Sequence, residues 1–214
     1  TTVKQLTAAA TSTTYRTHAT PRSFNTKFSM PGVLASAPSD TECLVLEFGA
    51  RYRGDLHLMG GVAKPSVAII TKLGWAHQGS MIGQAGIVAT KGELVEDLPA
   101  SGTAVISTDD PLAQGLPDRT AATVLTYGSV GDVRATGVRL SGDLSLSLSV
   151  ATPWGEADLR PAVRGEHHVT NVLASLAGAL AVGVPLDAAV AGIEQAEPPA
   201  RRMQMHRIDR DILV

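Results

Sequence analysis

Three side chains able to take part in chemistry lie at the carboxyl ends of predicted strands or in the elements just beyond them. Glu47 closes the apolar run in VLEFGAR, His77 lies in GWAHQG after a second apolar run, and Lys91 begins KGEL in a predicted helix. In open α/β sheets, ligands bind at the carboxyl ends of the strands. A carboxylate, an imidazole and a lysine at that edge therefore predict metal-assisted chemistry.

Each of these side chains also has a plain structural interpretation. Glu47 is equally well read as a surface glutamate after a strand. A single histidine such as His77 is more often structural or solvated, and a lysine placed like Lys91 is more often solvated. Only the joint placement of the three favours a functional site.

Other polar residues give weaker signals. His167 and His168 are adjacent, and neighbouring residues on a helix diverge by roughly 100 degrees, so no zinc site is predicted. Arg201 and Arg202 follow two prolines in a predicted turn, where they either clamp a phosphate or face solvent. Cys43, the only cysteine, lies in the run CLVLEF and is predicted to be a buried small hydrophobe without chemistry.

The first half of the chain alternates predicted strands with predicted helices. The strands are predicted over 43–48, 67–71 and 103–106, and the helices over 55–63, 84–98 and 110–115. A further helix is expected in TTVKQLTAAA. This alternation predicts an α/β fold with a mostly parallel sheet flanked by helices.

The pattern changes after about Val124. DVRATGVRL and LSLSLSVATPW alternate apolar and polar residues around Ser141-Gly142, which predicts an appended small antiparallel sheet over about 124–162. Helices are predicted over 167–182, with an apolar stripe, and from Pro185 to about Ala196. Two short strands are predicted around Asp209.

Composition narrows the class of protein. The chain has 214 residues, 44% of them hydrophobic, and a formal net charge of -2. One large domain is predicted, and the charge gives no reason to expect a nucleic-acid partner. No apolar run approaches the roughly 18 residues of a membrane span, so no membrane association is expected. A cytoplasmic monomer is predicted by default.

The sequence contains no complete phosphate loop of the form GxxxxGK[ST]. It begins TTVKQL, with a predicted helix directly following. In a phosphate loop the last hydroxyl residue opens a helix and binds Mg²⁺. The start therefore looks like a chain cut immediately after the GK of such a loop, with Thr1 as the hydroxyl residue.

Eight short motifs occur in a characteristic order: TTVKQL, TPRSFN, VLEFGAR, GWAH, KGELVEDLP, TDDP, GEHHVTNVLAS and PPARRM. In this set the chain resembles the Mur ligases, most closely the central ATPase domain of the MurF type. The resemblance implies that residues 1–214 are a central ATP-binding domain without the upstream phosphate loop. It also implies that the family's amino- and carboxy-terminal domains, which would be partners of this one, are missing.

The resemblance implies a site for ATP and two Mg²⁺ ions. Thr1 and Glu47 match residues that ligate Mg²⁺ near the phosphates, and His77 matches a ligand of the second ion. Lys91 matches a lysine that is carbamylated in these ligases, so that an ammonium becomes an anionic group supporting the metals.

Two further residues match positions that contact the nucleotide. Asn171 matches an asparagine near the adenine, and Arg202 matches an arginine on the phosphates. The implied reaction adds D-Ala-D-Ala to a UDP-linked tripeptide, the UDP-N-acetylmuramoyl precursor of peptidoglycan, through an acyl phosphate. The isolated fragment is expected to be inactive.

Several positions depart from the family pattern around this site: Thr26, Ser29, Lys72, Trp75, Ser107 and His168. They leave two alternatives open. One is a paralogous Mur-like ATP-dependent amide ligase of another pathway. The other is a nucleotide-binding relic without catalytic activity.

Overall fold

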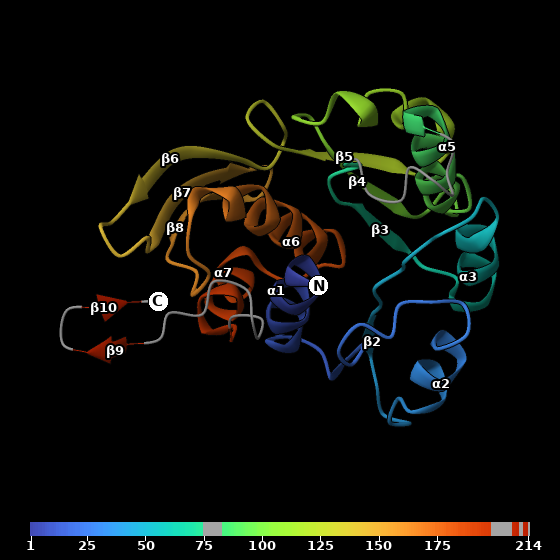
Figure 1. Ribbon diagram of the computed structural model, residues 1–214, viewed down its shortest axis with the longest axis horizontal. Coiled ribbons are helices and arrows are strands. Elements are labelled where there is room, and N and C mark those ends of the chain that lie inside the picture. Colours follow the sequence, from blue (N-terminus) through green and yellow to red (C-terminus); the bar gives the residue numbers. More distant parts are fainter. Residues whose placement is uncertain (75–82, 198–206, 210–211, 214) are drawn as a thin grey trace.

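The computed structural model describes residues 1–74, 83–197, 207–209 and 212–213 (Figure 1). The first part contains α1 Thr2–Ser12, β1 Thr17–Ala19, α2 Met30–Ala35, β2 Cys43–Val45, α3 Asp55–Ala63, β3 Val67–Ile70, α5 Gly83–Glu96, β4 Thr103–Ser107 and β5 Thr123–Tyr127. The second part contains β6 Arg134–Leu140, β7 Leu146–Thr152, β8 Gly155–Leu159, α6 Val169–Ala181, α7 Leu186–Gln195, β9 Arg207–Asp209 and β10 Ile212–Leu213.

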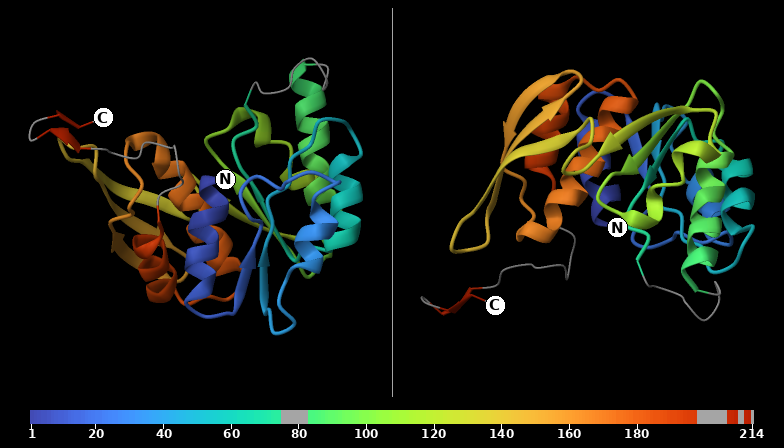
Figure 2. Two further views of the ribbon diagram at one scale, coloured as in Figure 1. Left: turned by 60° about the horizontal axis from the view of Figure 1, so that its bottom comes forward. Right: turned by 90° about the horizontal axis from the view of Figure 1, so that it is seen from above.

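The parallel strands form two groups. β1 pairs with β2, and β3, β4 and β5 form a three-stranded sheet in that order. Helices α1 and α6 lie on one side of these strands, and α3 and α5 lie on the other (Figure 2). The predicted α/β fold with a flanked parallel sheet is therefore confirmed. Within the described residues, β2 and β3 belong to different sheets, and a groove separates them.

The alternation of side chains along β3 explains why both faces are covered. Val67 and Ile69 pack against the hydrophobic core under α1 and α6, whereas Ala68 and Ile70 lie in a second core under α3 and α5. Helix α6 approaches β3 closely at Gly178, where an added Cβ would lie 2.3 Å from Ile69 Cδ1. Strands buried on both faces are typical of a helix-covered parallel sheet.

The antiparallel sheet consists of β6, β7 and β8, and α7 packs against β8. Its predicted start at about Val124 is wrong, because β5 pairs in parallel with β4 along 123–127. Leu125 lies in the core under α6, and Val124 packs against the core under α5. A strand buried on both faces belongs to the covered sheet, so the antiparallel part begins only at Arg134.

Two other predicted elements differ from the structure. The helix predicted over 110–115 is a single 3-10 turn, Pro111–Ala113, whose first turn is capped by the Asp110 carboxylate. Strand β2 ends at Val45 rather than at residue 48, because the next residues bond to the loop 20–25.

The remaining predicted elements are confirmed. They are the helices α1, α3, α5, α6 and α7, the strands β3 and β4, the hairpin of β6 and β7, and the antiparallel pair β9 and β10. β1 and α2 were not predicted, because three and six residues are too few to show a period. None of the helices in the described ranges is long and apolar enough to cross a membrane.

Candidate active site

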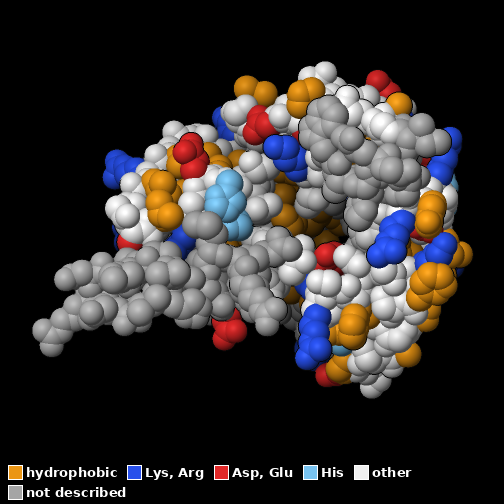
Figure 3. All heavy atoms as spheres, viewed as in Figure 1, with side chains coloured by type: hydrophobic (Ala, Val, Ile, Leu, Met, Phe, Trp, Pro, Cys, Tyr) orange, Lys and Arg blue, Asp and Glu red, His pale blue; other side chains and the backbone are white. Residues whose placement is uncertain are grey.

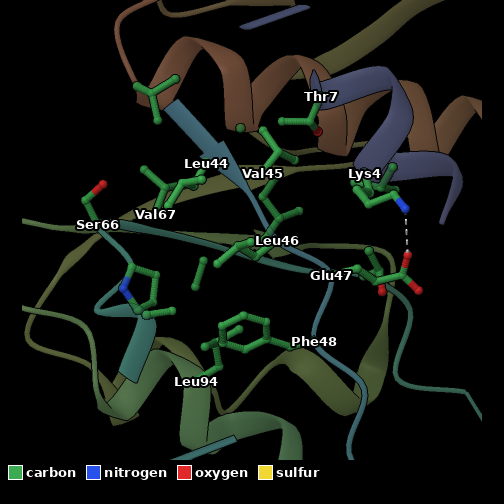
Figure 4. Close-up of a pocket in the computed structure, with 18 of the residues that line it drawn as sticks. Lys4, Thr7, Leu44, Val45, Leu46, Glu47, Phe48, Ser66, Val67 and Leu94 are labelled. Carbon is green, nitrogen blue, oxygen red and sulfur yellow. Dashed lines mark ion pairs between the residues drawn. The ribbon is translucent and has the colours of Figure 1, made fainter. Parts of the chain in front are cut away.

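A groove of about 1130 Å³ lies between β2 and β3. Helix α1 and the end of α6 line one side of it, and α5 lines the other. Hydrophobic side chains line the hollow visible in Figure 3, and Figure 4 shows Val45, Leu46 and Val67 along its walls. Thr1, Glu47 and Lys91 all line this groove, so three of the predicted site residues share one cavity.

Glu47 is held by side chains from two segments, the start of α1 and the loop 20–25. The Thr1 hydroxyl donates to Glu47 Oε1 at 3.3 Å, and Asn25 Nδ2 donates to the same oxygen at 3.0 Å. Lys4 Nζ lies 3.6 Å from Oε2, an ion pair that Figure 4 marks with a dashed line. The Glu47 side chain is only 18% exposed. This places a fixed carboxylate beside the start of α1.

Charge and burial act in opposite directions on Glu47. Burial alone would raise its pKa. The hydrogen bond from the Asn25 amide and the charge of Lys4 act in the opposite direction and lower the pKa of the carboxyl. Glu47 is therefore an anion at neutral pH, as a metal-binding carboxylate must be.

The loop 20–25 folds around the segment after β2. Glu47 N–H donates to Thr20 Oγ1 at 3.0 Å, and Gly49 N–H donates to the Asn25 carbonyl at 2.6 Å. A Cβ at Gly49 would lie 3.0 Å from Asn25 Cγ, so a larger residue would have to displace the Asn25 side chain that bonds to Glu47. Hydrogen bonds therefore join the segments TPRSFN and VLEFGAR directly to each other.

Lys91 enters the groove from α5. Burial lowers the pKa of its ammonium, and the negative charge of Glu47 partly opposes that effect. A lysine with a lowered pKa has a larger neutral fraction and is a better nucleophile. Lys91 is therefore a candidate nucleophile, and it lies on the wall of the groove opposite Glu47.

Asn171 does not line the groove. It lies in the first turn of α6, where its Nδ2 is 3.0 Å from His168 Nδ1. His168 is 5% exposed, and its ring is tilted against that of His167, with the ring centroids 4.2 Å apart. The structure thus holds Asn171 at the start of α6, beside His168 and outside the lining of the groove.

His77 and Arg202 lie outside the described residues, as do Trp75 and Arg201. Within the described part, no three His, Cys, Asp or Glu side chains converge as a metal cage.

Some departures from the family pattern have structural roles. Thr26 and Ser29 exchange hydrogen bonds at the start of α2, each hydroxyl accepting the other's backbone N–H at 3.1 and 3.3 Å. Ser107 is buried and accepts the Asp109 N–H at 3.2 Å. Lys72 is exposed just after β3 and lines the groove. None of these contacts touches Glu47.

The buried carboxylates of TDDP and KGEL are structural. Asp110 accepts the Leu73 N–H at 2.7 Å and thereby ties the end of β4 to the end of β3. Glu93 accepts the Gly54 and Leu56 N–H groups at the start of α3. Of that second motif, Lys91 and Leu94 line the groove, and Lys91 is its one charged side chain there.

Lys4 and Asn25 are the contacts of Glu47 that the sequence did not identify as site residues. Lys4 flanks the buried face of α1 that Val3 and Leu6 mark, and it is 7% exposed. The position of this lysine beside an apolar stripe is the one sequence feature that could have identified it as a site residue. Cys43, predicted to be inert, is half-buried, and burial raises the pKa of its thiol.

The available donors suit Mg²⁺. Its usual protein ligands are one or two oxygens, the other positions being filled by water and phosphate. Glu47 Oε2 is buried and accepts no hydrogen bond, and the Thr1 hydroxyl lies beside the other oxygen. A carboxylate oxygen left without a donor fits a cation, so the residues present are compatible with magnesium.

A family model described as the Mur ligase middle domain matches residues 1–179. The chain belongs to the Mur ligase family. This Mur ligase domain is 33% identical over 208 residues to "UDP-N-acetylmuramoyl-tripeptide--D-alanyl-D-alanine ligase" of Mycobacterium tuberculosis (strain ATCC 25618 / H37Rv), covering 96% of this chain and 41% of that one. The enzyme of the same name from Bacillus subtilis (strain 168) is 26% identical over 214 residues and is covered to 46%.

Solved structures agree with this assignment. The crystal structure of MurF from Acinetobacter baumannii superposes with a TM-score of 0.94 at 29% identity, over 100% of this Mur ligase chain and 47% of that one. The MurF ligase from Thermotoga maritima, in complex with ADP, gives a TM-score of 0.84 at 22% identity, over 96% of this chain and 48% of that one. The chain therefore spans less than half the length of each of these four relatives.

Proposed function

We propose that this chain is the ATP-binding domain of a ligase that joins D-Ala-D-Ala to UDP-N-acetylmuramoyl-tripeptide. The observation that carries the proposal is the convergence of Thr1, Glu47 and Lys91 on one groove of a Mur ligase fold. The names of the relatives support these substrates, and ADP in the Thermotoga maritima enzyme supports the nucleotide.

In the proposed reaction, the γ-phosphoryl group moves from ATP to the terminal carboxylate of the tripeptide, and ADP leaves. The amine of D-Ala-D-Ala then attacks the acyl carbon, so that a C–N bond forms, phosphate leaves and the amine loses a proton. Two anions must approach each other in the first step. Positive charge and hydrogen-bond donors must therefore offset their repulsion.

Mg²⁺, when bound, would supply part of that positive charge. We assign Glu47 and the Thr1 hydroxyl to hold one ion, because these oxygens are adjacent and the carboxylate is fixed on three sides. His77 is proposed to hold a second ion, on the basis of its motif. Asn171 and Arg202 are likewise proposed to contact the adenine side and the phosphates of the nucleotide.

Lys91 is proposed to be carbamylated. Its neutral amine would attack CO₂, forming an N–C bond and releasing one proton to solvent, and the product carries a negative charge. The lowered pKa supports this step, because only the neutral amine reacts. The carbamate would then lie opposite Glu47 and help to hold the cations between them.

Phosphate release by the complete ligase tests the proposal. We expect release from ATP only when both the UDP-linked tripeptide and D-Ala-D-Ala are present, and an at least hundredfold loss in Glu47→Gln. Ligation by Lys91→Ala should be lost and partly restored by small carboxylates. Turnover with other acid and amine pairs would support a paralogous ligase, and phosphate release that ignores both substrates would refute the proposal.

A further inference from the structure

Lys4 is a buried lysine on the first turn of α1, with a side chain only 6% exposed. Its Nζ donates to the Thr20 carbonyl at 2.6 Å and to the Arg22 carbonyl at 2.5 Å. The same nitrogen lies 3.6 Å from Glu47 Oε2. We propose that Lys4 is a positioning residue that fixes Glu47 and the loop 20–25 for cation and nucleotide binding.

Counting donors separates this role from direct ligand binding. An ammonium group has three N–H donors and no acceptor. Two of them are used by the carbonyls of Thr20 and Arg22, and the charge of the group lies 3.6 Å from Glu47 Oε2. Most of the hydrogen-bonding capacity of Lys4 is therefore committed to the loop, and its charge acts on a ligand through the neighbouring Glu47 carboxylate.

The loop that Lys4 holds carries the other partners of Glu47. Thr20 Oγ1 accepts the Glu47 N–H, and Asn25 Nδ2 donates to Glu47 Oε1. Between them, Arg22 has a φ of 48°, a left-handed conformation that a non-glycine residue rarely adopts. The bonds from Lys4 to both sides of this turn oppose its relaxation, so one lysine fixes the carboxylate directly and through the loop.

The cost of burying Lys4 supports a specific purpose. An ammonium taken out of water without partners destabilises the fold by several kcal/mol, which the two carbonyls and the carboxylate offset. A leucine or methionine would serve packing alone without that cost. Unlike an apolar side chain, the charge of Lys4 attracts the Glu47 carboxylate and so fixes where Glu47 Oε2 can lie.

Limited trypsin digestion tests the hold on the loop without requiring activity. Trypsin cleaves after exposed arginine, and both Arg16 and Arg22 have exposed side chains. In Lys4→Met, which keeps the aliphatic stem, we expect cleavage after Arg22 relative to Arg16 to rise at least tenfold. Lys64→Met, at an exposed lysine after α3, is the matched control and should leave this ratio unchanged. An unchanged ratio in Lys4→Met would overturn the proposal.

Kinetics of the complete ligase test the hold on Glu47, and this part rests on the proposed function. In Lys4→Met the Mg²⁺ concentration for half-maximal activity should rise about tenfold, and the KM for D-Ala-D-Ala should stay within about twofold. Partial unfolding would instead lower kcat and leave both the half-maximal Mg²⁺ concentration and the KM unchanged. That result would contradict a positioning role. If no variant of the ligase, wild type included, releases phosphate, the proposed function fails and the digestion still decides the role of Lys4.

Lys4→Arg provides a second variant should Lys4→Met fail to fold. The guanidinium keeps the charge but is planar, so its donors cannot reach all three acceptors from one point. We expect a folded protein with faster cleavage after Arg22 and a raised Mg²⁺ requirement, both smaller in size than for Lys4→Met. A wild-type rate of cleavage after Arg22 together with a wild-type Mg²⁺ requirement would overturn the proposal.

Discussion

The Glu93 carboxylate on α5 accepts the Gly54 N–H at 2.7 Å and so caps the start of α3 from a neighbouring helix. The same carboxylate accepts the N–H groups of Leu56 and His57 at 3.2 and 3.4 Å. Glu93 is 1% exposed. One buried side chain therefore joins the two helices on the outer face of the sheet and satisfies donors that the helix cannot satisfy itself.

Glu93→Ala should destabilise the fold by about 3 kcal/mol, because it leaves several buried N–H groups without an acceptor. Glu93→Gln should lose less, about 2 kcal/mol, because its single carbonyl oxygen replaces only part of the carboxylate. Urea unfolding measures both. The exposed Glu156→Gln should stay within about 0.5 kcal/mol of wild type. Equal stability of Glu93→Ala and wild type would contradict the capping role.

Gly92→Ala should destabilise the fold by about 1–3 kcal/mol, because the new Cβ would lie 2.2 Å from Arg119 Nη1. Arg119 donates to the carbonyls of Val88 and Ala89 and pairs with Glu96. In an Arg119→Ala background the clash disappears, so Gly92→Ala should there become neutral or stabilising, as alanine is in a helix. Losses that simply add in the double variant would exclude this contact as the cause.

Asp110→Ala should destabilise the fold by about 2 kcal/mol and loosen the end of β3. Its carboxylate accepts the N–H groups of Leu73 and Leu112 at 2.7 and 3.0 Å. Hydrogen exchange should therefore accelerate at the Leu73 amide, while amides in the centre of β4 change only by the global loss. Asp118→Asn, at an exposed carboxylate on the same side of the sheet, serves as the control.

Lys91→Met should alter the pH dependence of stability in CO₂-free buffer. Burial lowers the folded-state pKa of Lys91 below its unfolded value. Between those two values the unfolded chain binds more protons, so the free energy of unfolding of the wild type should rise as the pH rises. Below the folded-state pKa the penalty of the buried charge is complete. Removing the ammonium should therefore flatten this alkaline rise and stabilise the protein at pH 7.

Urea unfolding at several pH values between 7 and 10 measures this effect. Lys64→Met should keep the slope of the wild type, because Lys64 is exposed. Identical slopes for Lys91→Met and wild type would show that Lys91 is not desolvated. A carbamate formed in bicarbonate buffer is observable separately as a ¹³C resonance that Lys91→Met lacks.

Local sequence patterns predicted most elements of the fold correctly. The apolar periods predicted α3, α5, α6 and α7 within a few residues. Strand β5 was misassigned because the antiparallel part, inferred from the alternation in DVRATGVRL and LSLSLSVATPW, was started too early, whereas both faces of β5 are covered in the structure. The period shows which side chains alternate, whereas the neighbouring elements decide which faces are buried.

The residues of the candidate site likewise include some that the sequence predicted and some that it did not. Glu47 and Lys91 were recognisable because each follows a clear apolar pattern and belongs to an ordered motif set. The contacts of Lys4 were not recognisable, because they depend on carbonyls at Thr20 and Arg22 that only the folded loop brings close. Asn25 meets Glu47 across 22 positions in the sequence, and no local rule predicts such a pairing.

The groove between β2 and β3 also affects how this chain behaves in solution. Within the described residues, each of these strands has a ladder partner on one side only, and the other side faces the groove, whose walls include Val45, Leu46 and Val67. Unpaired strand edges bond readily to further strands, and apolar hollows take up hydrophobic dyes. A preparation of these 214 residues should therefore self-associate as its concentration rises and bind such dyes while folded. Stability measured at low micromolar concentration would then report the domain rather than its aggregates.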